Sequence, residues 1–489
     1  MTLDPDICWR AWTSRDRRFE GRFFLGVTST RIYCRPGCPA RVPARRNARF
    51  YGSAAAAEAA GFRPCLRCRP ETTRGSAAWQ GTSATVARAL RLIDEGLLDG
   101  GSVERLADRL GITSRWLRQL FNEQVGASPL EVAMTRRVHF ARRLLDETGM
   151  RLADIALATG FASERRLRAA IQATFRRPPS ALRGRGDAAR GAALALRVPA
   201  RAPFAPAPLL AFFAARAIPG VEAIEGATYR RTIVLDGALT TLEVELDAAT
   251  PGLTLRVPEA APRSLLPLVA RVTRLFDLDA DAMTIAAHLR RDPVLAKIVP
   301  VTGVRVPGAW DAFELGVRAL LGQQVSVAAA RTLAGRLVHA CGTALPTPCG
   351  TLTHVFPDAA AVAAAPLEAL GLTRARAAAL RGFAAAVASG ALDLAAPGEL
   401  EESVARLTAL PGIGDWTAQY IALRALREPD AFPAGDLAVR KALARGKTLP
   451  SERDVRTHAE RWRPWRAYAT LALWTHTAAA TPRRSKDTR

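Results

Sequence analysis

Four cysteines near the start of the chain lie in two close pairs that could bind a metal. Three residues separate Cys34 from Cys38, and two residues separate Cys65 from Cys68. Thiolate pairs at this spacing are typical of a tetrahedral zinc site. Four thiolates outweigh the charge of one Zn2+, so a sulfur in such a site can stay nucleophilic and accept an alkyl group. The spacing alone favours a purely structural site over a reactive one.

A glycine turn and a carboxylate far along the chain could also do chemistry. The turn is the Pro-Gly-Ile-Gly sequence at residues 411–414, and Asp436 follows it after a Pro-Ala-Gly turn. Glycines before a helix expose N–H groups that a phosphate can approach. A carboxylate beside a sugar could stabilise the oxocarbenium-like transition state of glycosyl cleavage or activate water. The alternative for Asp436 is plain helix capping, and the glycine motif favours catalysis.

Positive charge is the main feature of the composition. The 489 residues carry a formal net charge of +24, and a polyanion such as nucleic acid is the default partner of so basic a chain. Arginines surround the cysteine pairs in sequence. The arginines there that we expect to approach DNA are Arg35, Arg41 and Arg67.

A repeat occupies the segment between these two regions. Residues 106–114 match residues 155–163, and each copy has a short helical pattern, a glycine, a serine expected at the next N-cap, and then a basic helix. This is the helix-turn-helix pattern, with an ordinary helical hairpin as the alternative. Two copies with arginine on each expected reading helix favour DNA binding. Those arginines are Arg115, Arg118, Arg165, Arg166 and Arg168. The repeat and the ending at residues 175–183 resemble the tandem module of AraC-type regulators.

The cysteine region resembles the N-terminal domain of the Ada family. The matching residues are Ile32-Tyr33-Cys34-Arg35-Pro36-Gly37-Cys38, Arg49-Phe50-Tyr51 and residues 60–68. The resemblance implies that Cys34 takes a methyl group from a DNA methylphosphotriester, and that Cys34, Cys38, Cys65 and Cys68 bind one zinc ion. The Pro-Cys-His-Arg motif of a second Ada methyltransferase is absent, since Pro348-Cys349 is followed by Gly350.

The C-terminal half resembles the helix-hairpin-helix DNA glycosylases, and especially 3-methyladenine glycosylases of the AlkA type. Residues 311–326, 416–420 and 461–466 carry the match. The resemblance implies a catalytic Asp436, a base pocket of Trp416, Tyr420 and Trp474, and a DNA-gripping turn of Gly412, Ile413 and Gly414. Gln324 stands where the family has an apolar wedge. Trp416 stands where strand-cutting relatives have a lysine, so we expect no lyase activity, and no cysteine cluster for an iron–sulfur centre follows Cys349.

The elements that must position these residues define a multidomain α+β protein. Period-two segments after residue 230 predict strands, and nearly everything from about residue 265 predicts helix. We expect a small zinc domain at 1–78, an all-α tandem helix-turn-helix at 83–183, a linker at 184–203, an α/β subdomain at 204–300 and an all-α helix-hairpin-helix glycosylase domain at 301–480.

Together these patterns predict a fusion that repairs alkylated DNA and regulates the response to it. The expected partners are double-stranded DNA, both alkylated and operator, and RNA polymerase. No apolar run long enough for a membrane span and no secretory signal is present, so we expect a cytoplasmic, nucleoid-associated protein without a membrane partner. Two alternatives stay open: a transcription regulator with a catalytically weak glycosylase domain, and a glycosylase with a merely structural zinc domain.

Overall fold

The computed structural model of the chain divides into two compact units. It describes residues 4–16, 19–70, 84–184, 194–257, 264–395, 399–444, 446 and 448–480. The first unit comprises Met1–Ala202, Val234–Thr273 and Leu278–Ala280. The second unit comprises Pro203–Ile233, Arg274–Asp277 and Asp281–Arg489.

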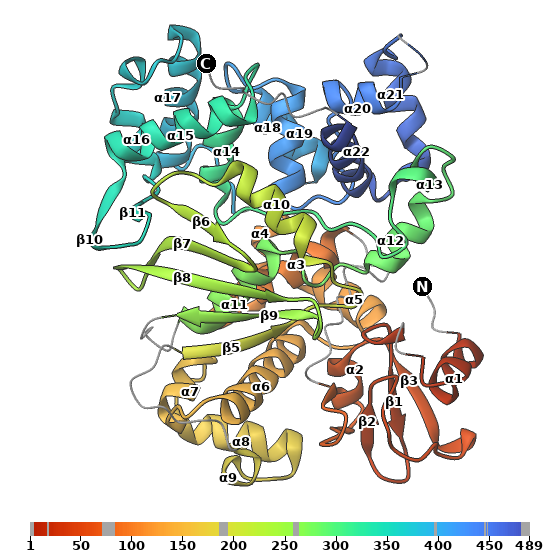
Figure 1. The fold of residues 1–489 in the computed structure, drawn as a ribbon. Helices are drawn as coiled ribbons and strands as arrows, with labels where there is room; N and C mark the ends of the chain where they lie inside the picture. Colours follow the sequence, from red (N-terminus) through yellow and green to blue (C-terminus); the bar gives the residue numbers. More distant parts are fainter. Residues whose placement is uncertain are drawn as a thin grey trace. The chain divides into compact units, whose positions relative to one another are not determined.

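The zinc domain, taken here as residues 4–70, is a small sheet with helices beside it (Figure 1). The strand order is β3-β1-β2-β4, with β1 antiparallel to β2 and β3, and β4 parallel to β2. Successive side chains point to opposite sheet faces, and two apolar clusters form accordingly. The elements are α1 (Pro5–Thr13), β1 (Phe24–Val27), β2 (Ile32–Cys34), β3 (Ala48–Tyr51), α2 (Ala54–Ala59) and β4 (Arg63–Pro64).

Seven helices follow in the first unit, as the helical period predicts. A capping box between Ser128 and Glu131 starts the longest of them, α6. Gly111 and Gly160 make the two turns with φ of 69° and 73°. Ser163 caps its reading helix as expected, but Thr113, not Ser114, caps the other. The helices are α3 (Ala84–Asp94), α4 (Val103–Arg109), α5 (Ser114–Gln124), α6 (Pro129–Glu147), α7 (Leu152–Ala158), α8 (Glu164–Phe175) and α9 (Pro179–Leu182).

A five-stranded antiparallel sheet has the order β5-β9-β8-β7-β6. The structure differs here from the expected linker at 184–203, because residues 194–199 form β5, paired with β9. The alternation Leu-Ala-Leu-Arg-Val at 194–198 produces this strand, and residues 185–193 lie outside the described residues. The strands are β5 (Leu194–Pro199), β6 (Glu222–Glu225), β7 (Thr228–Leu235), β8 (Ala238–Asp247) and β9 (Gly252–Val257), with helices α10 (Pro206–Arg216) and α11 (Leu265–Leu275).

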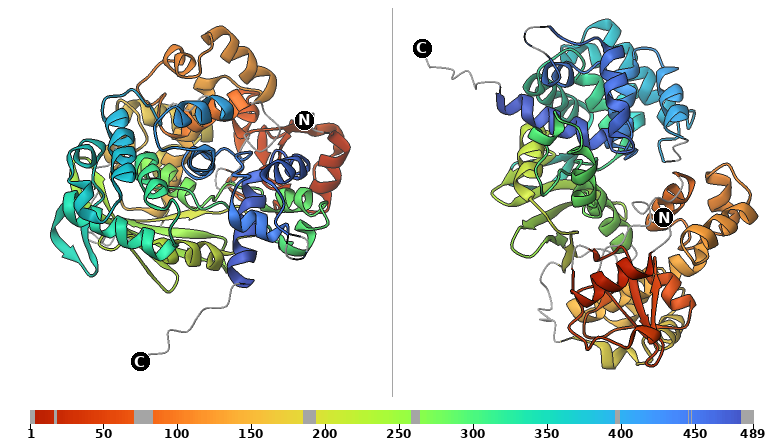
Figure 2. Two further views of the ribbon diagram at one scale, coloured as in Figure 1. Left: turned by 90° about the horizontal axis from the view of Figure 1, so that it is seen from above. Right: turned by 90° about the vertical axis from the view of Figure 1, so that its right-hand side faces the viewer.

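The described residues from 281 onward are almost entirely helical, and Figure 2 shows them from two further directions. The expectation of helix alone is wrong at residues 343–355, where β10 (Thr343–Cys349) and β11 (Leu352–Val355) pair as a hairpin around Gly350, whose φ is 60°. The helices are α12 (Ala282–Leu289), α13 (Leu295–Ile298), α14 (Ala312–Leu321), α15 (Val327–Cys341), α16 (Ala359–Ala364), α17 (Arg374–Ala388), α18 (Leu400–Thr408), α19 (Asp415–Arg424), α20 (Leu437–Ala442), α21 (Glu452–Ala459) and α22 (Arg466–Ala480).

The architecture therefore matches the predicted class: a small zinc-type domain, a helical tandem, a sheet-containing subdomain and a helical domain. The core of the helical domain includes Val317, Leu337, Leu380 and Ile421, all fully or almost fully buried. Among the described helices, none is both long and apolar enough to cross a membrane.

Candidate functional sites

The four predicted cysteines converge on one point of the zinc domain. Their Sγ atoms all lie within 4.8 Å of one another, and all four residues are buried. Cys34 ends β2, and the amide of Cys38 donates to the carbonyl of Arg35 across a tight turn. The second pair is tied to the first because the amide of Cys65 donates to the carbonyl of Tyr33 at 2.9 Å.

The chemistry of this donor set fits zinc. Contact with the thiol of Cys38, then with the other two thiols, together with burial, raises the pKa of Cys34 well above its usual range. Four thiolates within 4.8 Å of one another would repel strongly, so these buried thiols can ionise together only around a cation. A closed set of four sulfurs is the ligand set of a tetrahedral zinc site. Cys8 is also buried in this domain but does not belong to the four-sulfur group.

The arginines predicted to approach DNA are at the surface or near it. Arg41 and Arg67 are exposed, while Arg35 is partly buried and pairs with Glu20 at 3.0 Å. On the two reading helices, all five predicted arginines are exposed, and Arg118 pairs with Glu104. Trp116 on α5 was missed by sequence reasoning although it is 46% exposed beside them. An aromatic next to arginine on a reading helix is the signal that could have found it.

The glycine turn connects α18 to α19 as predicted. Gly412 has a φ of 82°, and a Cβ there would lie 2.4 Å from the Cβ of Ala379, so only glycine fits. Gly414 precedes α19, and a Cβ there would meet nothing within 4 Å. Ile413 is buried in the core between them. The turn thus presents open backbone at the start of a helix, as an approaching phosphate requires.

Asp436 caps α20, and two indoles also contact it. Its Oδ1 accepts from the amides of Ala438 and Val439. Its Oδ2 accepts from Nε1 of Trp416 at 2.8 Å, and Oδ1 accepts from Nε1 of Trp474 at 3.0 Å. Helix capping and a position beside the predicted pocket aromatics are therefore compatible roles for Asp436. The same carboxylate caps α20 and contacts both indoles.

The predicted pocket aromatics form a stack beside this carboxylate. The rings of Trp416 and Tyr420 lie 5.3 Å apart and nearly parallel, and those of Tyr420 and Trp474 lie 5.8 Å apart at 41°. The faces of such rings can hold a cationic purine. Helix α19 supplies two of the rings at a spacing of four residues, and α22 supplies the third.

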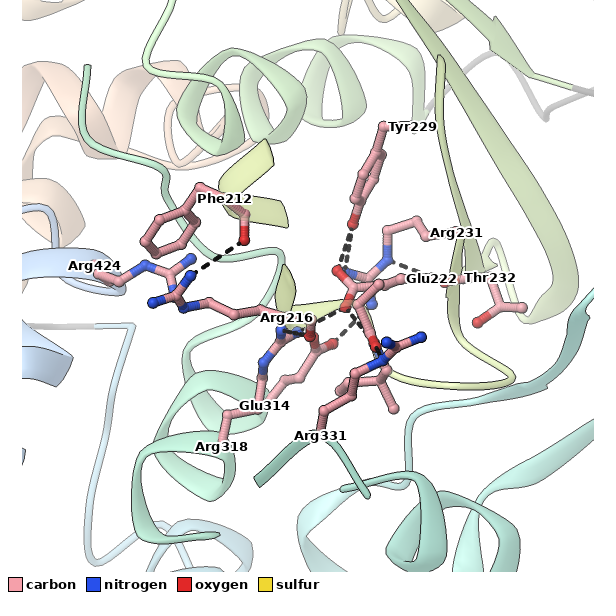
Figure 3. A network of polar contacts seen from close by, with 12 residues as sticks. Phe212, Arg216, Glu222, Tyr229, Arg231, Thr232, Glu314, Arg318, Arg331 and Arg424 are labelled. Atoms are coloured by element: carbon pink, nitrogen blue, oxygen red, sulfur yellow. Dashed lines mark hydrogen bonds and ion pairs between the residues drawn. The ribbon is translucent and has the colours of Figure 1, made fainter. Parts of the chain in front are cut away.

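Two arginines that sequence reasoning missed lie behind Tyr420. Arg424 donates to the Tyr420 hydroxyl at 2.9 Å, and its other N–H groups bind the carbonyls of Pro307 and Gly308. Figure 3 shows Arg216 and Arg424 beside Phe212, whose ring centroid lies 3.8 Å from the Arg216 guanidinium carbon. Burial raises the pKa of Tyr420, but the charges of Arg424 and Arg216 outweigh it and lower this pKa overall.

A buried ion network continues from these arginines (Figure 3). Glu222 accepts from Arg318 at 2.8 Å, and Glu314 accepts from Arg231 at 2.7 Å. Tyr229 also donates to Glu222. The network links β6, β7 and α14, and Arg318 also donates to the carbonyl of Arg216 on α10. It therefore holds these strands against α14, the helix that precedes the loop carrying Gln324.

That loop, between α14 and α15, carries Gln324. Gln324 is exposed, with a φ of 54° that holds it at the tip of the turn. Gln323 donates to the carbonyl of Gly412 at 2.9 Å and to the hydroxyl of Thr417 at 3.0 Å. These two hydrogen bonds tie the loop that carries Gln324 to the glycine turn, so the loop and the turn keep a fixed position relative to each other. Gln323 was not singled out from the sequence.

A glycine turn before a helix, a carboxylate among aromatic rings, a four-cysteine site and a tandem helix-turn-helix together define a multidomain DNA-repair protein with its own DNA-binding module. Family profiles match each part: the metal binding domain of Ada over residues 7–71, a helix-turn-helix domain over 106–185, the AlkA N-terminal domain over 195–311 and the HhH-GPD superfamily of base excision DNA repair proteins over 317–467.

The relatives identify the family. A probable bifunctional transcriptional activator/DNA repair enzyme AlkA of Mycobacterium tuberculosis is 42% identical over 97% of both chains. The DNA-3-methyladenine glycosylase 2 of Escherichia coli is 36% identical over 54% of this chain and 92% of its own length. A 3-methyladenine DNA glycosylase of Archaeoglobus fulgidus shares the fold over 58% of this chain and 99% of that one, with a TM-score of 0.51 at 22% identity. This chain belongs to the family of bifunctional transcriptional activator/DNA repair enzymes of the AlkA type.

Proposed function

We propose that this protein both repairs alkylated DNA and reports the damage. One part is a monofunctional glycosylase that hydrolyses the N-glycosidic bond of alkylated bases of the 3-methyladenine and 7-methylguanine class. The other part accepts methyl groups from DNA methylphosphotriesters at Cys34 and activates a sequence-specific regulator. The observation that carries the glycosylase is Asp436, held by two indole N–H groups beside an aromatic stack.

Base recognition uses the residues around the glycine turn. The exposed backbone at Gly412 and Gly414 binds a DNA phosphate without reading sequence. The damaged base leaves the duplex, and Gln324 enters the gap from its anchored loop. Alkylation at N3 or N7 gives a purine positive charge, which the faces of Trp416, Tyr420 and Trp474 attract.

Cleavage then depends on Asp436. As the bond from the sugar to the base breaks, its electron pair leaves with the base and positive charge develops on the sugar. The carboxylate stabilises that charge and orients a water molecule, which adds to the anomeric carbon and loses a proton. The products are a free base and an abasic site in an unbroken strand, because Trp416 offers no amine to form a Schiff base.

The methyl-acceptor reaction depends on Cys34. Cys34, Cys38, Cys65 and Cys68 would hold one zinc ion, which would supply the positive charge that favours the thiolate form of these side chains. The Sγ of Cys34 attacks the methyl carbon of the phosphotriester, a sulfur–carbon bond forms as the carbon–oxygen bond breaks, and the electron pair stays on the phosphate oxygen. The phosphodiester is restored and Cys34 is left as a thioether, so each chain reacts once.

Methylation removes one negative charge from the zinc domain. Repulsion between this domain and DNA phosphates then falls, and operator binding strengthens. The arginines of α5 and α8 read the operator, and RNA polymerase is the expected further partner. These partners place the protein at the nucleoid in the cytoplasm.

One experiment separates the two activities. The full chain is incubated with duplex DNA treated with a methylating agent; released bases are measured by chromatography and transferred methyl groups by mass spectrometry of the protein. Asp436→Asn should lower base release by about 100-fold or more and leave methyl transfer intact. Cys34→Ala should do the reverse, and Cys349→Ala, at an exposed cysteine, is the control. Near wild-type base release by Asp436→Asn would assign the step to another residue.

A second experiment tests whether the glycosylase is monofunctional. Borohydride is added to the protein on a damaged duplex, because it would trap any Schiff base between protein and DNA. No trapped adduct is expected, and the strand should break only after added base or heat. A trapped band would contradict the proposal and direct attention to Lys441 on α20.

A further inference from the structure

Cys34 and Tyr33 are neighbours on β2 and face opposite sides of the small sheet. Cys34 lies in the cluster that contains the other three cysteines. Tyr33 is fully buried in the other cluster with Phe24 and Phe62. Because side chains alternate along a strand, contacts made by Tyr33 hold the same short strand that carries Cys34.

The hydroxyl of Tyr33 contacts the buried carboxylate of Glu58, which joins the zinc domain to the helix-turn-helix tandem. The Tyr33 hydroxyl donates to Oε1 of Glu58 on α2 at 2.9 Å. From α6, Nε2 of His139 lies 2.7 Å from the same oxygen, and the hydroxyl of Thr135 donates to Oε2 at 2.8 Å. The side chain of Glu58 is only 16% exposed and that of His139 only 11%. Each oxygen of Glu58 is thus engaged by α6.

The backbone around this carboxylate is also closely packed. The hydroxyl of Ser53 donates to the carbonyl of Val125 at 3.0 Å. A Cβ on Gly126 would lie 3.1 Å from the Cβ of Ala56, so α2 lies directly against the turn that precedes α6. Arg69, just past the last zinc ligand, pairs with Asp146 near the end of α6. Contacts at both ends of α6 leave the zinc domain in one orientation on it.

Helix α6 is the element shared by both helix-turn-helix copies. It packs against α3 of the first copy's bundle and against α7, α8 and α9 of the second. A domain docked on α6 is therefore held relative to both reading helices, α5 and α8.

We infer that Glu58 is a positioning residue that docks the zinc domain on α6, and that this docking converts the charge change at Cys34 into a change in operator affinity. The inference rests on the proposed role of Cys34 as methyl acceptor. A docked zinc domain is already oriented when it reaches the DNA. The free energy gained from its weaker repulsion of the phosphates therefore adds fully to the binding free energy of the tandem. A zinc domain attached only through a flexible linker would lose part of that free energy, because binding would also have to fix its orientation.

The test measures the ratio of operator affinities with and without methylation. The probe is a duplex selected from a random library by the methylated wild-type chain. Full-length wild type, Glu58→Gln and His139→Gln are each methylated on methylphosphotriester DNA and compared at one salt concentration. His139→Gln leaves the sequence of the zinc domain unchanged. Glu245→Gln makes the same charge change at an exposed site on β8, outside both reading helices, and is the matched control. Zinc content and methyl uptake are measured for every variant.

The wild type and Glu245→Gln should gain about fivefold or more in affinity on methylation. Glu58→Gln and His139→Gln should bind zinc and take up methyl normally, but their gain should fall to near one. If both variants keep the full gain while only their melting temperature falls, Glu58 is merely structural and the inference is wrong. If the wild type itself shows no gain while Cys34 is methylated, the proposed switch fails and the docking role fails with it.

Discussion

The indole nitrogen of Trp416 donates a hydrogen bond to Oδ2 of Asp436 at 2.8 Å, across twenty residues of sequence. Trp416 is the second residue of α19, which begins directly after the glycine turn, and Asp436 caps α20. The bond therefore ties the glycine turn to the carboxylate. In the function proposed above, this contact helps to fix the separation between the phosphate at the turn and the sugar at Asp436.

Replacing Trp416 by Phe keeps an aromatic face but removes the N–H donor. Base release should fall by about tenfold or more, because a hydrogen bond to a charged group contributes about 1.5–3 kcal/mol. The measurement is single-turnover base release, in a double-mutant cycle with Asp436→Asn. In the Asp436→Asn background, Trp416→Phe should lower the rate of base release only slightly further. An equal loss in both backgrounds would mean that Trp416 acts through the base and not through the carboxylate.

Alanine at the two glycines of the turn should have opposite effects. Gly412→Ala should destabilise the protein by about 1–3 kcal/mol, because its φ is 82° and the new Cβ would meet Ala379. Gly414→Ala should leave the melting temperature nearly unchanged but weaken binding to non-specific duplex, because its open side is where the phosphate approaches. Calorimetry and a salt titration of binding check the pair. Unchanged affinity in Gly414→Ala would show that the phosphate binds elsewhere.

Glu222 should make the stability of the second unit depend on pH. Burial raises the pKa of Glu222, but the charges of Arg318 and Arg231 outweigh it and lower this pKa below its ordinary value. Because the folded-state pKa is depressed, the stabilisation is present above the unfolded pKa of about 4.3 and is lost as pH falls through the folded pKa.

Calorimetry of the full chain from pH 7 down to about pH 3, which passes below the unfolded pKa of about 4.3, checks this, following the transition that also abolishes base release. Glu222→Gln should lower the melting temperature of that transition at pH 7, because breaking a buried ion pair costs about 3–5 kcal/mol. The melting temperature of this variant should also fall less steeply as the pH is lowered. Glu225→Gln, at an exposed partner of Arg230, is the control. An undiminished acid dependence in Glu222→Gln would assign it to other carboxylates.

Removal of zinc should separate the two halves of the function. A mercurial reagent with a chelator should strip the metal and unfold the zinc domain, because binding energy is folding energy at such sites. Methyl transfer should stop, while base release continues, since Asp436 and its aromatic partners lie in the second unit. The Cys349→Ala chain removes an exposed thiol that the reagent would also modify. Loss of base release in that chain would contradict the separation.

Local patterns in the sequence determined much of this protein. Each close pair of cysteines, the glycine turn and the cap at Asp436 depends on residues only a few positions apart. The backbone conformation within each of these features is therefore encoded locally. The two helix-turn-helix copies, with α5 and α8 as reading helices, follow from the 3.6-residue period and the turn glycines. The strand β5 was missed because its period-two pattern is short and lies in a Pro- and Ala-rich stretch.

The contacts that set the chemistry were decided only by the tertiary structure. Trp474 reaches Asp436 from α22, Gln323 reaches Gly412 across 89 residues, and His139 reaches Glu58 across 81 residues. Arg216 lies behind Tyr420 although it comes from α10. No local pattern encodes such pairs, because each depends on how separate helices pack, and packing is set by the whole buried surface and not by any one segment.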